Sequence, residues 1–209
     1  MCIRDRLDMA CAFVTGYGRK NYEGADGEIS ELTAHALGGR FVFPDLRTVI
    51  DIGGQDAKVI ALSPSGKMVN FVMNDKCAAG TGRFLDVMAS ILRLDVDDLD
   101  IEAAKAAAPA AISSTCTVFA ESEVISQLAN GVKRPDLVAG ICRSVASRVA
   151  ALARRAGVTE QVCLSGGVAR NDAVRQALSD ELNVPVSVDP LAQYFGAIGA
   201  ALWAYKQMT

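Results

Sequence analysis

The segment TVIDIGGQD, residues 48–56, places a run of apolar and β-branched residues directly before two glycines. The run predicts a strand over 48–52, followed by a tight loop. Two interpretations of the loop fit. The glycines could let a phosphate approach the backbone while Asp51 and Asp56 hold a hydrated Mg²⁺ ion, or the loop could be a turn between paired strands. The GxxxxGK[ST] pattern of a P-loop is absent from the chain.

Strands and helices alternate on both sides of this segment. Strands are predicted at 57–62 and 68–73 as a hairpin, at 161–165 and 185–188, with strand ends near 13–15 and 112–115. Helices are predicted at 28–37, after Cys77, at 101–108, after Cys116, and at 136–156, 171–182 and 194–206. This alternation is typical of an α/β protein.

Composition and charge limit the classes of function. With 209 residues, 51% of them hydrophobic, the chain can bury a core in one domain or two small lobes. A net charge of −3 argues against nucleic acid as a partner. No apolar run is long enough to span a membrane, and the first residues lack a signal peptide, so we expect a cytoplasmic protein. His35 is the only histidine and is predicted to be an ordinary helix residue, which argues against a multi-histidine metal site or a hydrolase triad.

The six cysteines are scattered and form no CxxC pair, which favours reduced thiols over a disulfide scaffold. Cys77 and Cys116 each precede an amphipathic helix, a position that lowers thiol pKa and suits a metal-bound thiolate. The alternative is that both are small buried residues. An iron–sulfur cluster commonly needs four thiolates, which a twofold homodimer would supply as two from each chain. Cys142 and Cys163 are predicted to be core residues.

A second glycine pair lies in the segment SGGVARN, residues 165–171, between a predicted strand and a predicted helix. Such a loop removes side-chain bulk beside a helix N-terminus and so suits a nucleotide, although many strand–helix loops contain glycine. Together with Gly80-Thr81-Gly82 and the loop after residue 52, it indicates nucleotide binding.

Five motifs resemble those of a known protein family and follow one another in the same order along the chain. They are DIGGQD (51–56), NDKCAAGTGRFL (74–85), SSTCTVFAESE (113–123), SGGVARN (165–171) and YFGAIGA (194–200). From about Thr15 onward the chain resembles the activator components of 2-hydroxyacyl-CoA dehydratases. These belong to the same ATPase family as the ATPase subunits of benzoyl-CoA reductases.

The resemblance implies an actin-like, ribonuclease-H-like ATPase that forms a homodimer around one [4Fe-4S] cluster. It assigns roles to individual residues, as follows. Cys77 and Cys116 are the cluster ligands; Asp51 positions Mg²⁺ and is catalytic together with Gln55; Gly53, Gly54 and Gln55 contact phosphates or the attacking water; Gly166 and Gly167 line the adenosine site; and Gln193 is a weaker nucleotide contact.

The implied activity is ATP-driven donation of one electron to a 2-hydroxyacyl-CoA dehydratase, with ferredoxin or flavodoxin as the donor that loads the cluster. Three alternatives remain open: the ATPase subunit of a benzoyl-CoA reductase, a kinase with the same nucleotide-binding fold, and an inactive nucleotide-binding fragment.

The resemblance also divides the chain. Residues 1–47 are expected to be the remnant of a first actin-like lobe, because residues 1–20 lack the family's first phosphate loop. We therefore expect this lobe to be truncated at its N-terminus. Residues 48–192 are expected to form the second lobe with the cluster-binding helices, and 193–209 a helix that packs back toward the first lobe.

Overall fold

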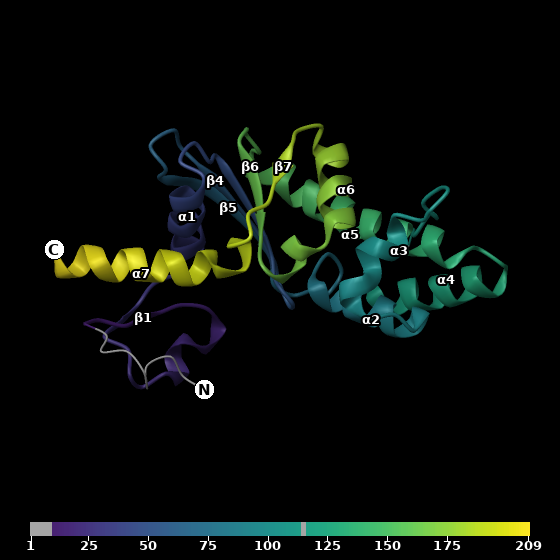
Figure 1. The fold of residues 1–209 in the computed structure, drawn as a ribbon, viewed down its shortest axis with the longest axis horizontal. Coiled ribbons are helices and arrows are strands. Elements are labelled where there is room, and N and C mark those ends of the chain that lie inside the picture. The colour runs from purple at the N-terminus through teal and green to yellow at the C-terminus, as the bar shows by residue number, and fades with distance from the viewer. Residues whose placement is uncertain (1–9, 114–115) are drawn as a thin grey trace.

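A five-stranded mixed sheet lies at the centre of the computed structural model, which describes residues 10–113 and 116–209 (Figure 1). Its strand order is β5-β4-β3-β6-β7. The strands are β3 (Thr48–Ile52), β4 (Ala57–Leu62), β5 (Met68–Asn74), β6 (Val162–Ser165) and β7 (Val186–Ser187). The pairs β3–β4 and β4–β5 are antiparallel, whereas β3–β6 and β6–β7 are parallel. The α/β class and the predicted hairpin are confirmed.

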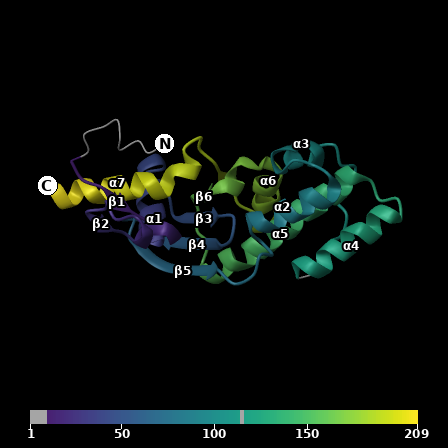
Figure 2. The same cartoon turned by 90° about the horizontal axis from the view of Figure 1, so that it is seen from below.

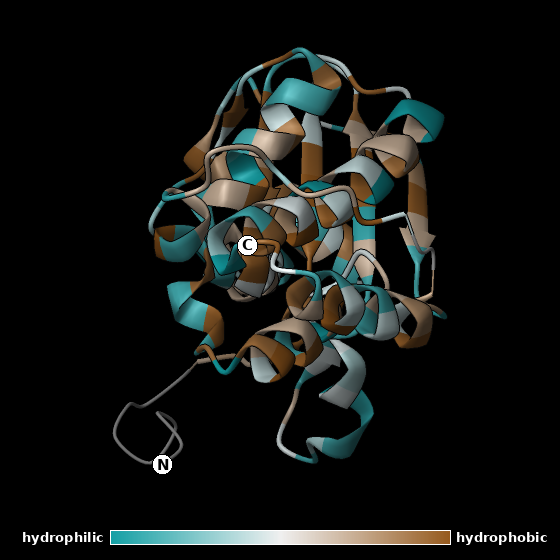
Figure 3. Ribbon diagram, turned by 90° about the vertical axis from the view of Figure 1, so that its right-hand side faces the viewer, coloured by the Kyte–Doolittle hydropathy of each residue, from teal (hydrophilic) through white to brown (hydrophobic). Residues whose placement is uncertain are grey.

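The central strands are buried along their whole length. Strands covered on both faces need apolar side chains on both, which is why these segments are nearly continuous apolar runs. In Figure 3 apolar colour marks stretches of the strands at the back of the view, and it also marks parts of the helices in front of them. The edge strand β5 differs, because it is exposed over most of its residues.

The longest helix, α5 (Arg134–Ala156), covers the sheet over β4 and β5 and also packs against α6 (Asp172–Leu182). Its buried face repeats at four-residue steps through Leu137, Ile141 and Val145, and Gly157 ends it in the left-handed conformation. The helices α2 (Gly82–Leu92), α3 (Leu99–Ala103) and α4 (Thr117–Ala129) lie at the end of the molecule away from the C-terminus (Figures 1 and 2).

At the opposite end, α1 (Glu31–Val42) and α7 (Phe195–Met208) pack against each other, beside the short parallel pair β1 (Phe13–Val14) and β2 (Gly27–Glu28) (Figure 2). The helix α7 thus contacts a helix from the range expected to be the first lobe; the division of the chain into lobes stays a prediction. Short 3-10 turns complete the order: η2 (Tyr17–Asn21), η3 (Val96–Asp98), η4 (Gly167–Arg170) and η5 (Ala192–Tyr194).

Two predicted elements are wrong. The helix expected at 101–108 begins at Leu99 and ends at Ala103. The Asp136 carboxylate accepts hydrogen bonds from the backbone N–H groups of Ala107 (2.8 Å) and Ala108 (3.1 Å), which therefore do not continue the helix. Residues 112–113 are not in a strand, and 114–115 lie outside the described residues.

Among residues 10–113 and 116–209, no helix combines the length and the apolar character needed to cross a membrane.

The contact between α1 and α7 predicts the effect of a small substitution. An ideal Cβ at Gly199 would lie 1.8 Å from the carbonyl oxygen of Ala34, so Gly199→Ala must push the helices apart. We expect a loss of about 1–3 kcal/mol in the free energy of unfolding, measured by urea denaturation. Gly18→Ala is the control, because a Cβ there meets nothing within 4 Å. Equal losses in the two variants would contradict this packing.

Candidate functional site

The two predicted glycine loops lie side by side. They follow β3 and β6, which are adjacent and parallel, so their carboxyl ends share one edge of the sheet. Gly53, Gly54 and Gly167 all line a cavity of about 270 Å³, together with Gly82 at the start of α2. Its volume is just below the range of about 300–1,000 Å³ common for small-molecule sites. The sequence motifs therefore converge on one concave surface.

Gly166 lies where the two loops touch. Its φ is +84°, and an ideal Cβ would lie 2.4 Å from the carbonyl oxygen of Ile52. Its backbone N–H donates to the carbonyl of Ala192 (3.3 Å), the residue before Gln193. Gly166 thus joins β3, β6 and the loop before α7, although it does not line the cavity itself.

The turn interpretation of the loop after β3 is confirmed, and the phosphate interpretation stays a prediction. The loop is the turn of the β3–β4 hairpin, closed by a hydrogen bond from Gly53 N–H to the Asp56 carbonyl (2.9 Å). It also forms part of the cavity wall. Gln55 is exposed at its tip, and Gln193 is exposed in η5; neither is among the residues that line the cavity.

The start of α2 is bound to the same loop. The backbone N–H of Gly82 donates to the Gly53 carbonyl (2.9 Å), and that of Arg83 donates to the Gly54 carbonyl (2.8 Å). These two N–H groups are therefore not free to bind phosphate or metal. They hold α2 to the Gly53–Gly54 loop instead.

The rest of the cavity wall is mostly acidic and apolar. Asp86, Asp97 and Asp100 line it, and Arg170 is the basic residue among the described lining residues. Carboxylates accept hydrogen bonds and so suit the hydroxyls of a sugar better than the oxygens of a phosphate. The phosphate-compatible part of the wall is the glycine backbone.

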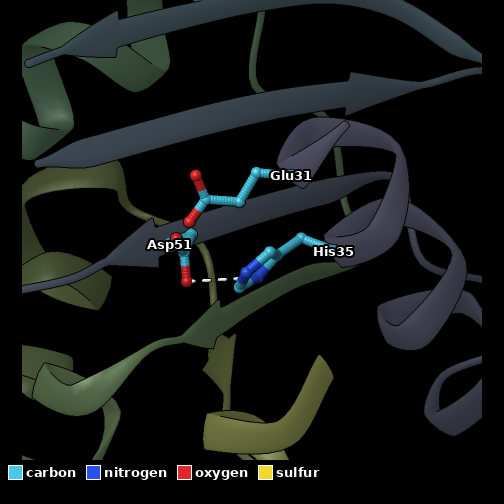
Figure 4. Close-up of side chains that lie close together, drawn as sticks. All are labelled: Glu31, His35 and Asp51. Atoms are coloured by element: carbon cyan, nitrogen blue, oxygen red, sulfur yellow. Dashed lines mark ion pairs between the residues drawn. The ribbon is translucent and has the colours of Figure 1, made fainter. Parts of the chain in front are cut away.

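Asp51 is buried and already surrounded by donors. Its Oδ1 accepts a hydrogen bond from Ser165 Oγ (2.8 Å) and lies 3.2 Å from His35 Nδ1, while its Oδ2 lies 3.4 Å from Lys58 Nζ. One ligand atom each of Glu31, His35 and Asp51 lies within 4.8 Å of the others (Figure 4). The ammonium of Lys58 beside them opposes a second cation, so direct coordination of Mg²⁺ by Asp51 would require a partner to move.

Sequence reasoning missed His35 and Lys58 as site residues. His35 does lie in a helix, as predicted, but it faces Asp51. Lys58 is 2% exposed. Burial opposes its charge, but attraction to Asp51, the hydrogen bond with Asp56 and attraction to Glu31 outweigh it and raise the pKa of Lys58, which stays charged at neutral pH. The available signal was a single lysine inside an otherwise apolar strand.

Cys77 lies in a loop fixed by Asn74. The Asn74 side chain accepts a hydrogen bond from Cys77 N–H (3.2 Å) and donates to the carbonyls of Cys77 (2.8 Å) and Ala79 (3.2 Å). The thiol itself is free and exposed. Cys77 precedes α2, as predicted, and lies four residues before the N-cap Thr81.

Cys116 is the N-cap residue of α4, and its thiol is also free and exposed. The chain before it is held to α4, because Glu123 accepts hydrogen bonds from Ser113 (3.0 Å) and Gln127 donates to the Ala111 carbonyl (2.7 Å). The helices α2 and α4 pack against each other. The two cysteines therefore precede two helices that are in contact.

Cys142 and Cys163 are buried, as predicted. Burial raises the pKa of the Cys142 thiol to about 12, with a smaller contribution from Asp100. Burial and the charge of Asp51 raise the pKa of Cys163 as well. Neither thiol is suited to a metal centre at the surface.

The mixed sheet with its paired glycine loops has the actin-like α/β fold of its structural neighbours. The chain belongs to the BadF/BadG/BcrA/BcrD ATPase family, whose model matches residues 3–204.

Named relatives of the chain include several activators. The chain is 60% identical to the (R)-2-hydroxyglutaryl-CoA dehydratase activating ATPase of Acidaminococcus fermentans over 96% of the chain and 77% of the relative. The crystal structure of that dehydratase's component A matches with a TM-score of 0.93 over 95% of this chain and 77% of that chain.

The activator of 2-hydroxyisocaproyl-CoA dehydratase from Clostridioides difficile, solved with bound ADPNP, matches with a TM-score of 0.94 at 53% identity, over 97% of this chain and 75% of that chain. A benzoyl-CoA reductase subunit of Thauera aromatica is 33% identical over 85% of the chain and 65% of the relative.

Thiol reactivity tests the exposure of the cysteines. With iodoacetamide at about pH 8, we expect Cys77 and Cys116 to be alkylated, because both thiols are free and exposed to solvent. Cys142 and Cys163 should stay unlabelled until the chain unfolds, because burial raises their pKa. Peptide mass spectrometry gives the site of labelling, and early labelling of Cys163 would contradict this assignment.

Gly166 and Gly167 form a matched pair for testing the loop contact. Gly166→Ala should lower the free energy of unfolding by about 2 kcal/mol or more, because of its positive φ and the contact with β3. Gly167→Ala should stay within about 0.5 kcal/mol, because its Cβ meets nothing within 4 Å. Equal losses in denaturant titrations would show that the loops do not touch as described.

Proposed function

We propose that the protein is an ATP-dependent activator that transfers one low-potential electron from a [4Fe-4S] cluster to a 2-hydroxyacyl-CoA dehydratase, coupled to ATP hydrolysis. One observation carries this proposal: the helix that follows Cys77 is bound by its first N–H groups to the glycine loop at the cavity. A nucleotide at that loop would therefore act on the segment that presents a metal-binding thiol. The names of the activators that resemble the chain support the same interpretation.

The donor set fits the cluster. A [4Fe-4S] cluster commonly needs four thiolates, and the part of each chain that the structure describes offers two exposed free thiols, Cys77 and Cys116. Two copies around a twofold axis would complete the set, and this ligand count supports a homodimer. When bound, the cluster supplies a one-electron carrier. The N-terminus of α4, capped by Cys116, adds a positive dipole end that stabilises negative charge there.

ATP would bind across the cavity. Gly53, Gly54 and the exposed Gln55 would contact the phosphates and the attacking water, and Gly166 and Gly167 would flank the adenosine. Gln193 would approach through the loop joined to Gly166. Because Asp51 is occupied by protein donors, it would orient a hydrated Mg²⁺ rather than coordinate the ion directly. Asp51 and Gln55 remain the proposed catalytic residues.

The electron would come from a reduced ferredoxin or flavodoxin, and the protein would act in the cytoplasm. The ATPase subunit of a benzoyl-CoA reductase is the second candidate, favoured by the resemblance to the reductase subunit of Thauera aromatica. That relative is 33% identical, against 60% for the 2-hydroxyglutaryl-CoA dehydratase activating ATPase, so the dehydratase partner is preferred.

Cysteine variants test the cluster. After anaerobic expression, Cys77→Ser and Cys116→Ser should each lose the iron and the [4Fe-4S] signal in electron paramagnetic resonance of the reduced protein, because a ligand of the cluster is missing. ADPNP affinity, measured by calorimetry, should change little. Cys142→Ser is the matched control and should keep its iron.

The alternatives give different results. An unchanged iron content in both cysteine variants would show that Cys77 and Cys116 are not the cluster ligands. If the protein contained no metal and phosphorylated a small molecule, it would instead be a kinase with the same nucleotide-binding fold. With a loaded cluster, electron delivery to a dehydratase or to a benzoyl-CoA reductase, compared in the same assay, would decide the partner.

A further inference from the structure

The buried side chain of Lys58 bridges both ends of the loop after β3. Lys58 lies on β4 directly opposite Asp51 on β3, so the two side chains share a face of the sheet. Its Nζ lies 2.8 Å from Asp56 Oδ2 and 3.4 Å from Asp51 Oδ2. Asp51 precedes the Gly53–Gly54 loop and Asp56 ends it. The Lys58 ammonium therefore contacts the carboxylates at both ends of the turn.

A third carboxylate joins this cluster from another element. Glu31, in the first turn of α1, lies 3.2 Å from Lys58 Nζ. The side chain of Lys58 is 3% exposed, so these charges interact with little screening by water. Without the ammonium, Glu31, Asp51 and Asp56 would face one another with uncompensated negative charge. The carboxylates would then separate, and the loop they flank would move.

The shape of the loop matters beyond the hairpin. The carbonyls of Gly53 and Gly54 accept the first hydrogen bonds of α2, and those two glycines line the cavity. Displacing Asp51 or Asp56 would displace these carbonyls as well. Lys58 therefore acts, through the loop, on both the cavity wall and the start of α2.

We propose that Lys58 is a positioning residue for ATP hydrolysis, which fixes the Gly53–Gly54 loop through Asp51 and Asp56 and thereby ties the loop to α2. The proposal deepens the proposed function, because it rests on ATP binding at this loop. Lys58 does not touch the cavity. Its effect is on the orientation of groups that would contact the phosphates, and misplacement of such groups can lower the rate by about 100-fold.

Hydrogen exchange without nucleotide tests the structural half of the proposal. In Lys58→Met, the N–H groups of Gly82 and Arg83 should exchange at least about tenfold faster, because their acceptors are no longer fixed. Those of α6 should keep their protection. Lys67→Met is the matched control, since Lys67 is exposed in the β4–β5 turn, and it should leave every site unchanged.

Steady-state kinetics test the functional half. Lys58→Met should lower kcat for ATP by up to about 100-fold with a smaller change in KM, because the adenosine contacts at Gly167 remain. Lys58→Arg, which keeps a positive charge, should recover part of kcat. A loss of global stability alone would not produce this split in a variant that stays folded at the assay temperature.

The outcomes separate the two proposals. If the unaltered chain binds no ADPNP and hydrolyses no ATP, the proposed function fails, while the exchange result still decides the role of Lys58 in the loop. If Lys58→Met folds and shows unchanged exchange at Gly82 and Arg83 and an unchanged kcat, the positioning role is overturned. If Lys58→Met does not fold, Asp56→Asn removes one flank of the bridge and must show the same faster exchange and lower kcat; wild-type values would overturn the proposal.

Discussion

Two hydrogen bonds connect the glycine loop at the cavity with the helix that follows Cys77. The N–H groups of Gly82 and Arg83 donate them to the carbonyls of Gly53 and Gly54. The first N–H groups of a helix have no acceptor inside that helix and must find one elsewhere. Here the acceptors are the carbonyls of a hairpin turn. As a result, α2 begins at the cavity wall, and the loop that carries Cys77 is only a few residues from it. The turn cannot change shape without breaking these bonds or moving the helix.

The strand end that leads into the turn is also fixed, through the side chain of Asp51. The Asp51 carboxylate accepts a hydrogen bond from Ser165 on β6. It also lies close to the His35 ring on α1 and forms an ion pair with Lys58 on β4. Side chains from three elements, β6, α1 and β4, therefore converge on one carboxylate. The close approach of Gly166 to the end of β3 adds a fourth constraint. The loop is thus a junction between the α1–α7 end of the molecule and the α2–α4 end.

The sequence predicted what depends on local pattern. The strand at 48–52, the hairpin after it and the helix near 136–156 follow from hydrophobic period and from Pro64 and Gly66 in the turn. The glycine loops and the two candidate thiols were also identified. The roles assigned to the site residues stay predictions.

What could not be predicted depends on contacts between distant residues. That Lys58 is buried, and which carboxylates surround it, follows only from the register of β3 with β4 and the position of α1. The alanine-rich segment after α3 has a helical composition, but the Asp136 carboxylate accepts hydrogen bonds from two of its N–H groups, 29 and 28 residues away in sequence.

The energy available at the junction also limits the mechanism. Two hydrogen bonds of about 1 kcal/mol each can bias α2 by about 30-fold, whereas a complete switch between two states needs about 10⁴-fold. The two bonds can therefore transmit a change at the glycine loop but cannot drive it alone. The remaining free energy would have to come from nucleotide contacts to both glycine loops at once, or from the proposed second copy and the proposed partner protein.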